Sequence, residues 1–159
     1  MPDFASNEIE IAWGQLESAL DQLVGLTSGL DGDRLNWRPT TGPHAAEGAN
    51  SLYILASHAL GLTEQATLFM LCGEPGERDR EAEFAASGPT SAAIEERWAS
   101  LRERIPASLS RIEEGALVAT FEHPVRGAES GRQLLLATAT HVATHLGHAE
   151  LTHDLIPAS

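Results

Sequence analysis

Lysine is absent from this chain, so its ten basic residues are all arginine, against 23 acidic residues. The formal net charge is -13 at pH 7. Proteins that bind nucleic acid or anionic membrane surfaces usually present a basic face, because phosphate groups attract Lys and Arg side chains. The composition therefore argues against both kinds of partner.

Cysteine is nearly absent as well, since Cys72 is the only one among 159 residues. A single cysteine cannot form a disulfide within the chain and suits a reducing compartment. The stretch MPDFASNEIE is acidic and lacks the apolar core of a signal peptide. No apolar run approaches the roughly 20 residues of a membrane span. We therefore expect a cytoplasmic protein that has no membrane partner.

The apolar residues fall into four stripes, in which the spacing alternates between three and four residues. These stripes cover roughly 7–30, 52–72, 91–112 and 131–156. Such spacing is typical of amphipathic helices that bury one face. Because 159 residues suit a single core, we expect one domain, residues 1–159, with the all-α fold of a four-helix bundle.

Capping residues at the stripe ends support these boundaries. The candidate N-caps are Ser6 or Asn7, Asn50 or Ser51, Thr90 or Ser91, and Ser130, which forms a capping-box pattern with Gln133. Gly73 is expected to end the second helix, and Pro157 the fourth. Pro106 lies inside the third stripe and removes one backbone hydrogen bond, so we expect a kink or break there.

The connections between the stripes differ in composition. Residues 31–50 are rich in Gly, Pro and Asp and predict an ordered loop, long enough to cross from one helix to a distant one. In this loop we expect Trp37 to fold onto the core, with ligand contact as the alternative, and His44 to lie at the surface. The composition of residues 73–89 indicates a polar connection between helices. The short alternation in 115–127 indicates a brief strand or hairpin, because Pro124 limits pairing.

Four of the seven histidines lie in one stretch, THVATHLGHAELTHDL, at residues 140–155. On a helix His141, His145 and His148 share one face, because each residue turns the chain by about 100°. His153 falls about a third of a turn away. Two histidines four residues apart can offer both imidazoles to one metal ion. The pattern therefore predicts two metal ligands on the fourth helix.

A third ligand has to come from another part of the chain, and His58 lies on the apolar stripe of the second helix. Burying an unpaired imidazole there would cost about 1–3 kcal/mol, so His58 needs a partner. We expect His58, His141 and His145 to converge on one divalent metal ion. Three neutral ligands leave coordination positions open.

Other interpretations of these residues stay open. The three histidines can also be hydrogen-bonded core and surface residues that bind no metal. His148 can replace His141 by pairing with His145 three residues away. His123 is a weaker candidate near the mouth of the bundle, and Cys72 is more consistent with a structural role than with a nucleophile.

Three motifs, in order along most of the chain, resemble those of a known family. They are LNWRP at 35–39, SLYILASHALGLTE around His58, and HVATHLGH at 141–148. The family is the DinB-like superfamily of metal-binding four-helix bundles, whose last motif usually reads His-x-x-x-His-x-Gly-Gln. The resemblance implies that His58, His141 and His145 are the metal ligands. His148 stands where the family usually has Gln, which suggests a supporting role beside the ligands.

The superfamily includes bacillithiol- and mycothiol-dependent transferases and isomerases. The resemblance thus implies a zinc or nickel ion that activates a low-molecular-weight thiol for transfer to a small electrophile. The cleft would lie between the second and fourth helices, with loops around Trp37 and Glu122 at its rim. Two alternatives stay open: a non-catalytic stress-response module that binds metal or a small ligand, and a thiol-dependent isomerase. A homodimer is one expectation for the assembly.

Overall fold

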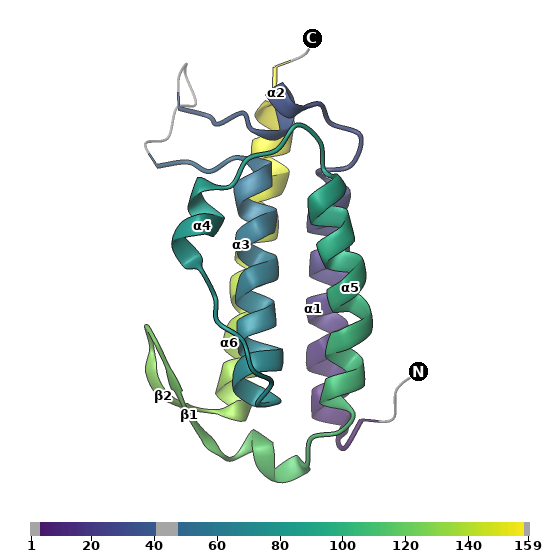
Figure 1. Ribbon diagram of the computed structural model, residues 1–159, viewed down its shortest axis with the longest axis vertical. Helices are drawn as coiled ribbons and strands as arrows, with labels where there is room; N and C mark the ends of the chain where they lie inside the picture. The colour runs from purple at the N-terminus through teal and green to yellow at the C-terminus, as the bar shows by residue number, and fades with distance from the viewer. Residues whose placement is uncertain (1–3, 41–47, 158–159) are drawn as a thin grey trace.

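The computed structural model describes residues 4–40 and 48–157, and four long helices dominate it (Figure 1). They are α1 (Asn7–Gly25), α3 (Leu52–Glu64), which continues as the π-helical segment η1 (Gln65–Leu71), α5 (Ala92–Leu109) and α6 (Gly131–Leu155). The shorter elements are α2 (Gly32–Leu35), α4 (Arg80–Ala85), the 3-10 segment η2 (Glu114–Leu117), β1 (Thr120–His123) and β2 (Gly127–Ser130). The predicted all-α bundle is confirmed, and so is the short hairpin, since β1 and β2 pair antiparallel.

The four long helices form a bundle with a crossover. In Figure 1, α1 and α6 run upward, whereas α3 and α5 run downward. Helices α1 and α3 each pack against both α5 and α6. The described residues of the connection from α1 to α3, which carry α2, lie at one end of the bundle (Figure 1). The connection from α3 to α5 returns along the outside of α3 and carries α4 (Figure 1).

Side-chain caps begin three of the long helices at the predicted residues. Ser6 Oγ accepts the Ile9 N–H at 3.4 Å, and Ser51 Oγ accepts the Ile54 N–H at 3.3 Å. Ser130 and Gln133 form the complete capping box that opens α6. These bonds satisfy amide groups that a helix leaves unpaired in its first turn.

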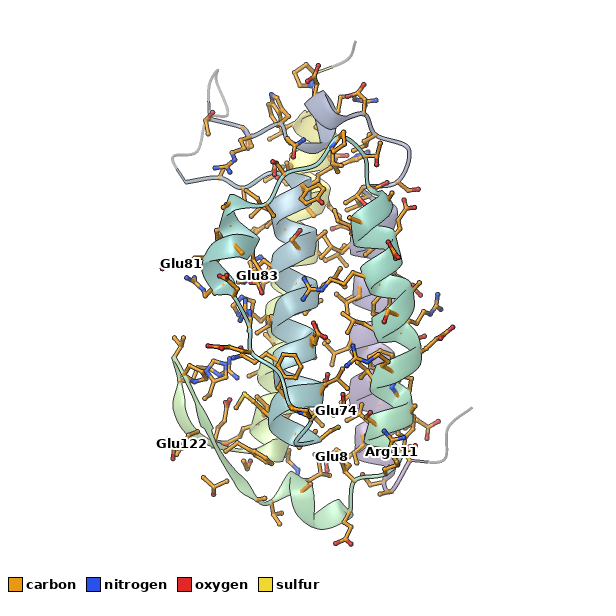
Figure 2. All side chains as sticks on the ribbon, in the orientation of Figure 1. Glu8, Glu74, Glu81, Glu83, Arg111 and Glu122 are labelled. Carbon is orange, nitrogen blue, oxygen red and sulfur yellow. The ribbon has the colours of Figure 1, made fainter. Side chains whose placement is uncertain are left out.

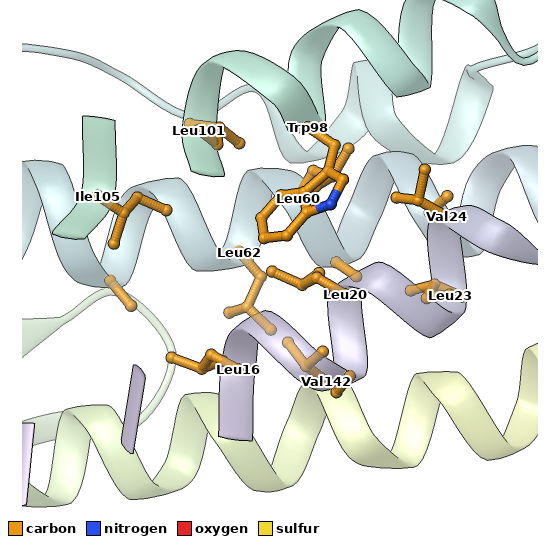
Figure 3. Packing of buried hydrophobic residues seen from close by; sticks show 14 of the residues in the cluster. Leu16, Leu20, Leu23, Val24, Leu60, Leu62, Trp98, Leu101, Ile105 and Val142 are labelled. Atoms are coloured by element: carbon orange, nitrogen blue, oxygen red, sulfur yellow. The ribbon is translucent and has the colours of Figure 1, made fainter. Parts of the chain in front are cut away.

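The core fills the space between the helices with the residues of the predicted stripes (Figure 3). Trp13 and Trp98 are each only 5% exposed, and their ring centres lie 6.3 Å apart. The indole N–H of Trp98 donates to Asp21 at 2.7 Å, so its polar edge is also satisfied. Arg102 and Arg104 on α5 are exposed, whereas Arg97 is half-buried and pairs with Glu64 at 2.9 Å. Within 4–40 and 48–157, no helix is both long and apolar enough to span a membrane.

Two expectations about the third stripe and the connection before it need correction. Helix α5 continues through Pro106 to Leu109, so the expected break is absent. Pro106 lies in the last turn, and the carbonyl of the exposed Arg102 can bond to water instead. The polar connection 73–89 contains the short helix α4, which Asp79 caps by accepting the Ala82 N–H at 2.9 Å.

We expect Leu20→Ala to lower the free energy of unfolding by about 2–5 kcal/mol, because it removes a side chain from the core and leaves a cavity. Leu20 is fully buried, whereas Leu136 on the outside of α6 is 56% exposed. The matched variant Leu136→Ala should change stability by no more than about 0.5 kcal/mol. Urea unfolding followed by circular dichroism measures both, and equal losses would contradict the assigned packing.

Candidate metal centre

Helices α3 and α6 lie side by side, and they bring His58, His141 and His145 together. The ring centre of His145 lies 4.6 Å from that of His141 and 4.8 Å from that of His58. One ring nitrogen from each residue lies within 4.8 Å of the other two. Ligand nitrogens around a tetrahedral zinc ion are about 3.3 Å apart, so modest side-chain rotations would complete the site.

Three of the four histidines of α6 are less buried than the sequence suggested. We expected His141, His145 and His148 to face inward, yet His141 and His148 are exposed and His145 is half-buried. All three line one cavity beside α3, and this cavity opens to solvent. The helical face was therefore predicted correctly, but it borders a cavity instead of the core. His153 does not line this cavity, and His44 lies outside the described residues.

His145 has the environment that a metal ligand requires. Both of its ring nitrogens are buried, and neither has a hydrogen-bond partner among the residues that the structure describes. Burial, followed by the charges of the neighbouring histidines and Arg78, lowers the pKa of His145 to about 4. The imidazole is therefore neutral near pH 7, with a lone pair available for a metal ion. The residues present fit a divalent ion bound through three nitrogens.

His58 is held in place by a buried carboxylate from α4. Its Nδ1 lies 3.0 Å from Glu83 Oε2, and this contact leaves Nε2 available for a metal ion. Metal-binding histidines commonly donate their second N–H to a carboxylate, which fixes the ring orientation. Figure 2 labels Glu83 and its neighbour Glu81, which is exposed.

Arg78 completes this arrangement by holding Glu83. Its Nε donates to Oε1 at 2.7 Å, and Nη2 donates to Oε2 at 2.5 Å. Burial raises the pKa of Glu83, but hydrogen bonds from Arg78 and His58 outweigh burial and hold that pKa below its ordinary value. Glu83 is therefore ionised at neutral pH and accepts the Nδ1–H of His58.

The sequence analysis missed Arg78 and Glu83, because the segment that carries them shows no apolar periodicity. Two signals could have found them. Asp79 precedes a run that suits a short helix and is a typical N-cap. Gly61, three residues after His58, leaves room for the carboxylate, since a Cβ there would lie 1.8 Å from Glu83 Oε1.

The cavity at the histidines has a volume of about 1170 Å³ and lies between α3, α6 and the connections that cover them. Its apolar wall includes Leu55, Leu62, Phe69, Met70, Leu151 and Leu155. Pro39 and Pro124, each two residues from Trp37 and Glu122 respectively, line the cavity. The side chains of Trp37 and Glu122 do not line it. The predicted cleft between the second and fourth long helices is therefore present.

Comparisons with known proteins agree with this architecture. The family model of the DinB superfamily matches residues 15–149, which is most of the chain. The chain belongs to the DinB superfamily. A DinB-like protein from Bacillus cereus ATCC 10987 has a similar crystal structure, with a TM-score of 0.70, 99% of each chain covered and 13% sequence identity. At this identity the likeness shows that the DinB fold is shared, and no more. No curated protein matches the chain.

In this DinB protein, Glu83→Gln should weaken zinc binding by about 10–100-fold, because the amide orients His58 less firmly than the carboxylate does. Chelator competition with the zinc-loaded protein measures the change. The matched control is Glu81→Gln, which removes the same charge from an exposed site on the same helix. Equal affinities for the two variants would show that Glu83 does not support the metal site.

Cys72 is half-buried, and burial, followed by the charge of Glu74, raises the pKa of its thiol to about 11. A raised pKa means less thiolate at every pH below it. We therefore expect alkylation by iodoacetamide at pH 8 to be roughly 100-fold slower in the folded than in the unfolded protein. Between pH 7 and 10 the rate for the folded protein should rise continuously. A plateau near pH 9, seen by mass spectrometry, would show an ordinary exposed thiol.

Proposed function

We propose that this DinB-superfamily protein is a metal-dependent enzyme that transfers a low-molecular-weight thiol to a small electrophile. His58, His141 and His145 would hold a divalent ion, with zinc or nickel as the candidates. The observation that carries the proposal is the position of His145, whose two ring nitrogens are buried without a partner between two other imidazoles. This cluster lies in a cavity large enough for small molecules.

The donor set supports this choice of metal and a reactive site. Imidazole nitrogen binds both zinc and nickel well, and three protein ligands are the usual number in catalytic zinc sites. Because all three donors are neutral, they leave the full charge of the ion uncompensated. Such an ion, when bound, lowers the pKa of a thiol at its open position and so supplies a nucleophile near neutral pH.

The protein itself contributes position, exclusion of water and a proton acceptor. Glu83, itself held by Arg78, fixes the ring of His58 through its Nδ1. The apolar wall shields a bound molecule from solvent on one side. His148 is exposed in the same cavity, with its ring centre 5.9 Å from that of His145. In this proposal His148 accepts the proton that the thiol loses.

We expect His145→Ala to abolish metal retention and thiol transfer together, because it removes one of three ligands. His148→Ala should keep the metal and reduce the rate or affinity by about 10–100-fold, since it supports the site without completing it. Elemental analysis and thiol consumption with a panel of small electrophiles measure the two effects. Both rates are normalised to folded protein by circular dichroism.

The outcomes separate the candidate functions. Folded His145→Ala that keeps its metal and rate would show that the ligand assignment and the mechanism are both wrong. Metal binding by the wild type without thiol consumption would favour a non-catalytic metal-binding module. A rearranged substrate with the thiol regenerated would identify an isomerase.

A further inference from the structure

Arg80 presents an unused cationic group to the metal cavity. It is exposed, lines the cavity from α4, and its guanidinium carbon lies 4.6 Å from the centre of the Phe84 ring. The Phe84 ring in turn lies 4.7 Å from that of His58. This stacking holds a flexible side chain beside the histidine cluster and leaves the N–H edge of the guanidinium free to bind a ligand.

The other two arginines of the cavity are already neutralised. Arg78 is paired with Glu83, and Arg126 donates to both carboxylate oxygens of Glu129, at 2.6 and 3.0 Å. Arg80, by contrast, has no ion pair or hydrogen bond in the part of the chain that the structure describes. Of the lining residues described, Glu77 is the acidic one, and it is exposed to solvent.

His123 presents a buried hydrogen-bond donor to the same cavity. The residue is 7% exposed, and its Nδ1 accepts the backbone N–H groups of Val125, at 3.2 Å, and Arg126, at 3.1 Å. Because Nδ1 is an acceptor, the proton of the neutral ring is on Nε2. Nε2 is buried and has no hydrogen-bond partner within the described ranges. A buried donor in this state costs free energy until an acceptor reaches it.

These features point to a specific class of ligand. We infer that the cavity binds a small molecule that bears a carboxylate. The carboxylate pairs with Arg80, and another oxygen of the same molecule accepts the Nε2–H of His123. The planar guanidinium matches a carboxylate through two parallel hydrogen bonds. The apolar wall of Leu55, Leu62 and Phe69 covers the carbon skeleton. The inference rests on the proposed function, because it specifies the charge of a molecule that enters the same site.

The direct test is equilibrium binding of succinate and of its neutral analogue succinamide to the full-length protein, measured by calorimetry with and without zinc. We expect succinate to bind at least about 10-fold more tightly than succinamide, and Arg80→Gln to remove about 10-fold of the succinate affinity. Arg104→Gln is the matched control, because it makes the same charge change on α5, from which no described lining residue comes. It should alter the affinity by less than about 2-fold.

His123→Asn tests the second contact without disturbing the hairpin. The side-chain oxygen of Asn can take the place of Nδ1 and accept the N–H groups of the turn, whereas the Nε2–H is lost. Succinate affinity should fall about 5-fold while the melting temperature stays close to that of the wild type. Unchanged affinity would overturn the role of His123.

Two pairs of reagents identify the molecule that carries the carboxylate. Mercaptosuccinate and thioglycerol differ in charge as thiols, and iodoacetate and iodoacetamide differ in charge as electrophiles. In one pair the wild-type protein should react faster with the anionic reagent than with the neutral one, and Arg80→Gln should abolish this difference. That pair shows whether the thiol or the electrophile carries the carboxylate.

The inference and the proposed function fail in different ways. Equal binding of succinate and succinamide, unchanged binding by Arg80→Gln, or tighter Arg80-dependent binding of inorganic phosphate would overturn the carboxylate assignment, even if thiol transfer occurs. Absence of thiol transfer, with succinate binding that depends on Arg80, would overturn the reaction and support the carboxylate site.

Discussion

The buried carboxylate of Glu83 connects the fold of this protein to its candidate chemistry. Arg78 and His58 both hydrogen-bond to it, so one side chain joins the connection between α3 and α5 to the histidine cluster. A buried carboxylate without such partners would be strongly destabilising, because it loses its hydration. Removal of Arg78 therefore affects both the position of α4 and, through Glu83, the orientation of His58. Gly61 makes this contact possible, since any side chain there would occupy the space of the carboxylate.

The bundle and the histidine cluster could be predicted from the sequence because both depend on short-range periodicity. Spacings of three and four residues place Leu20 and Trp98 in the core, and the same helical geometry puts His141 and His145 on one face. Ser130 and Gln133 carry their signal within a single turn. Each of these predictions needs only the geometry of one helix. Placing His58 in the cluster required one further assumption, that the second and fourth long helices are adjacent.

The remaining parts of the site depend on contacts between distant segments, which local patterns do not encode. Glu83 reaches His58 from 25 positions away, through a segment that the sequence indicated only as a polar connection. The tautomer of His123 is set by backbone N–H groups of the following turn. Arg80 is positioned by the ring of Phe84, which packs on His58. Pro106 does not break α5, because the loss of one hydrogen bond costs little free energy in the last turn, where water can bond to the freed carbonyl.

The distribution of unsatisfied groups around the cavity ties these observations together. Among the residues that the structure describes, most polar side chains of the core have partners, yet the ring nitrogens of His145 and the Nε2 of His123 have none. Each such group lowers stability when the cavity is empty, so any metal or ligand that satisfies it adds to the stability of the folded state. The positions of these groups differ: His145 lies among imidazoles that suit a cation, whereas His123 offers an N–H that suits an oxygen acceptor. The cavity thus combines imidazole nitrogens of the kind that bind metal ions with an N–H donor of the kind that binds oxygen acceptors, in a chain whose net charge is -13.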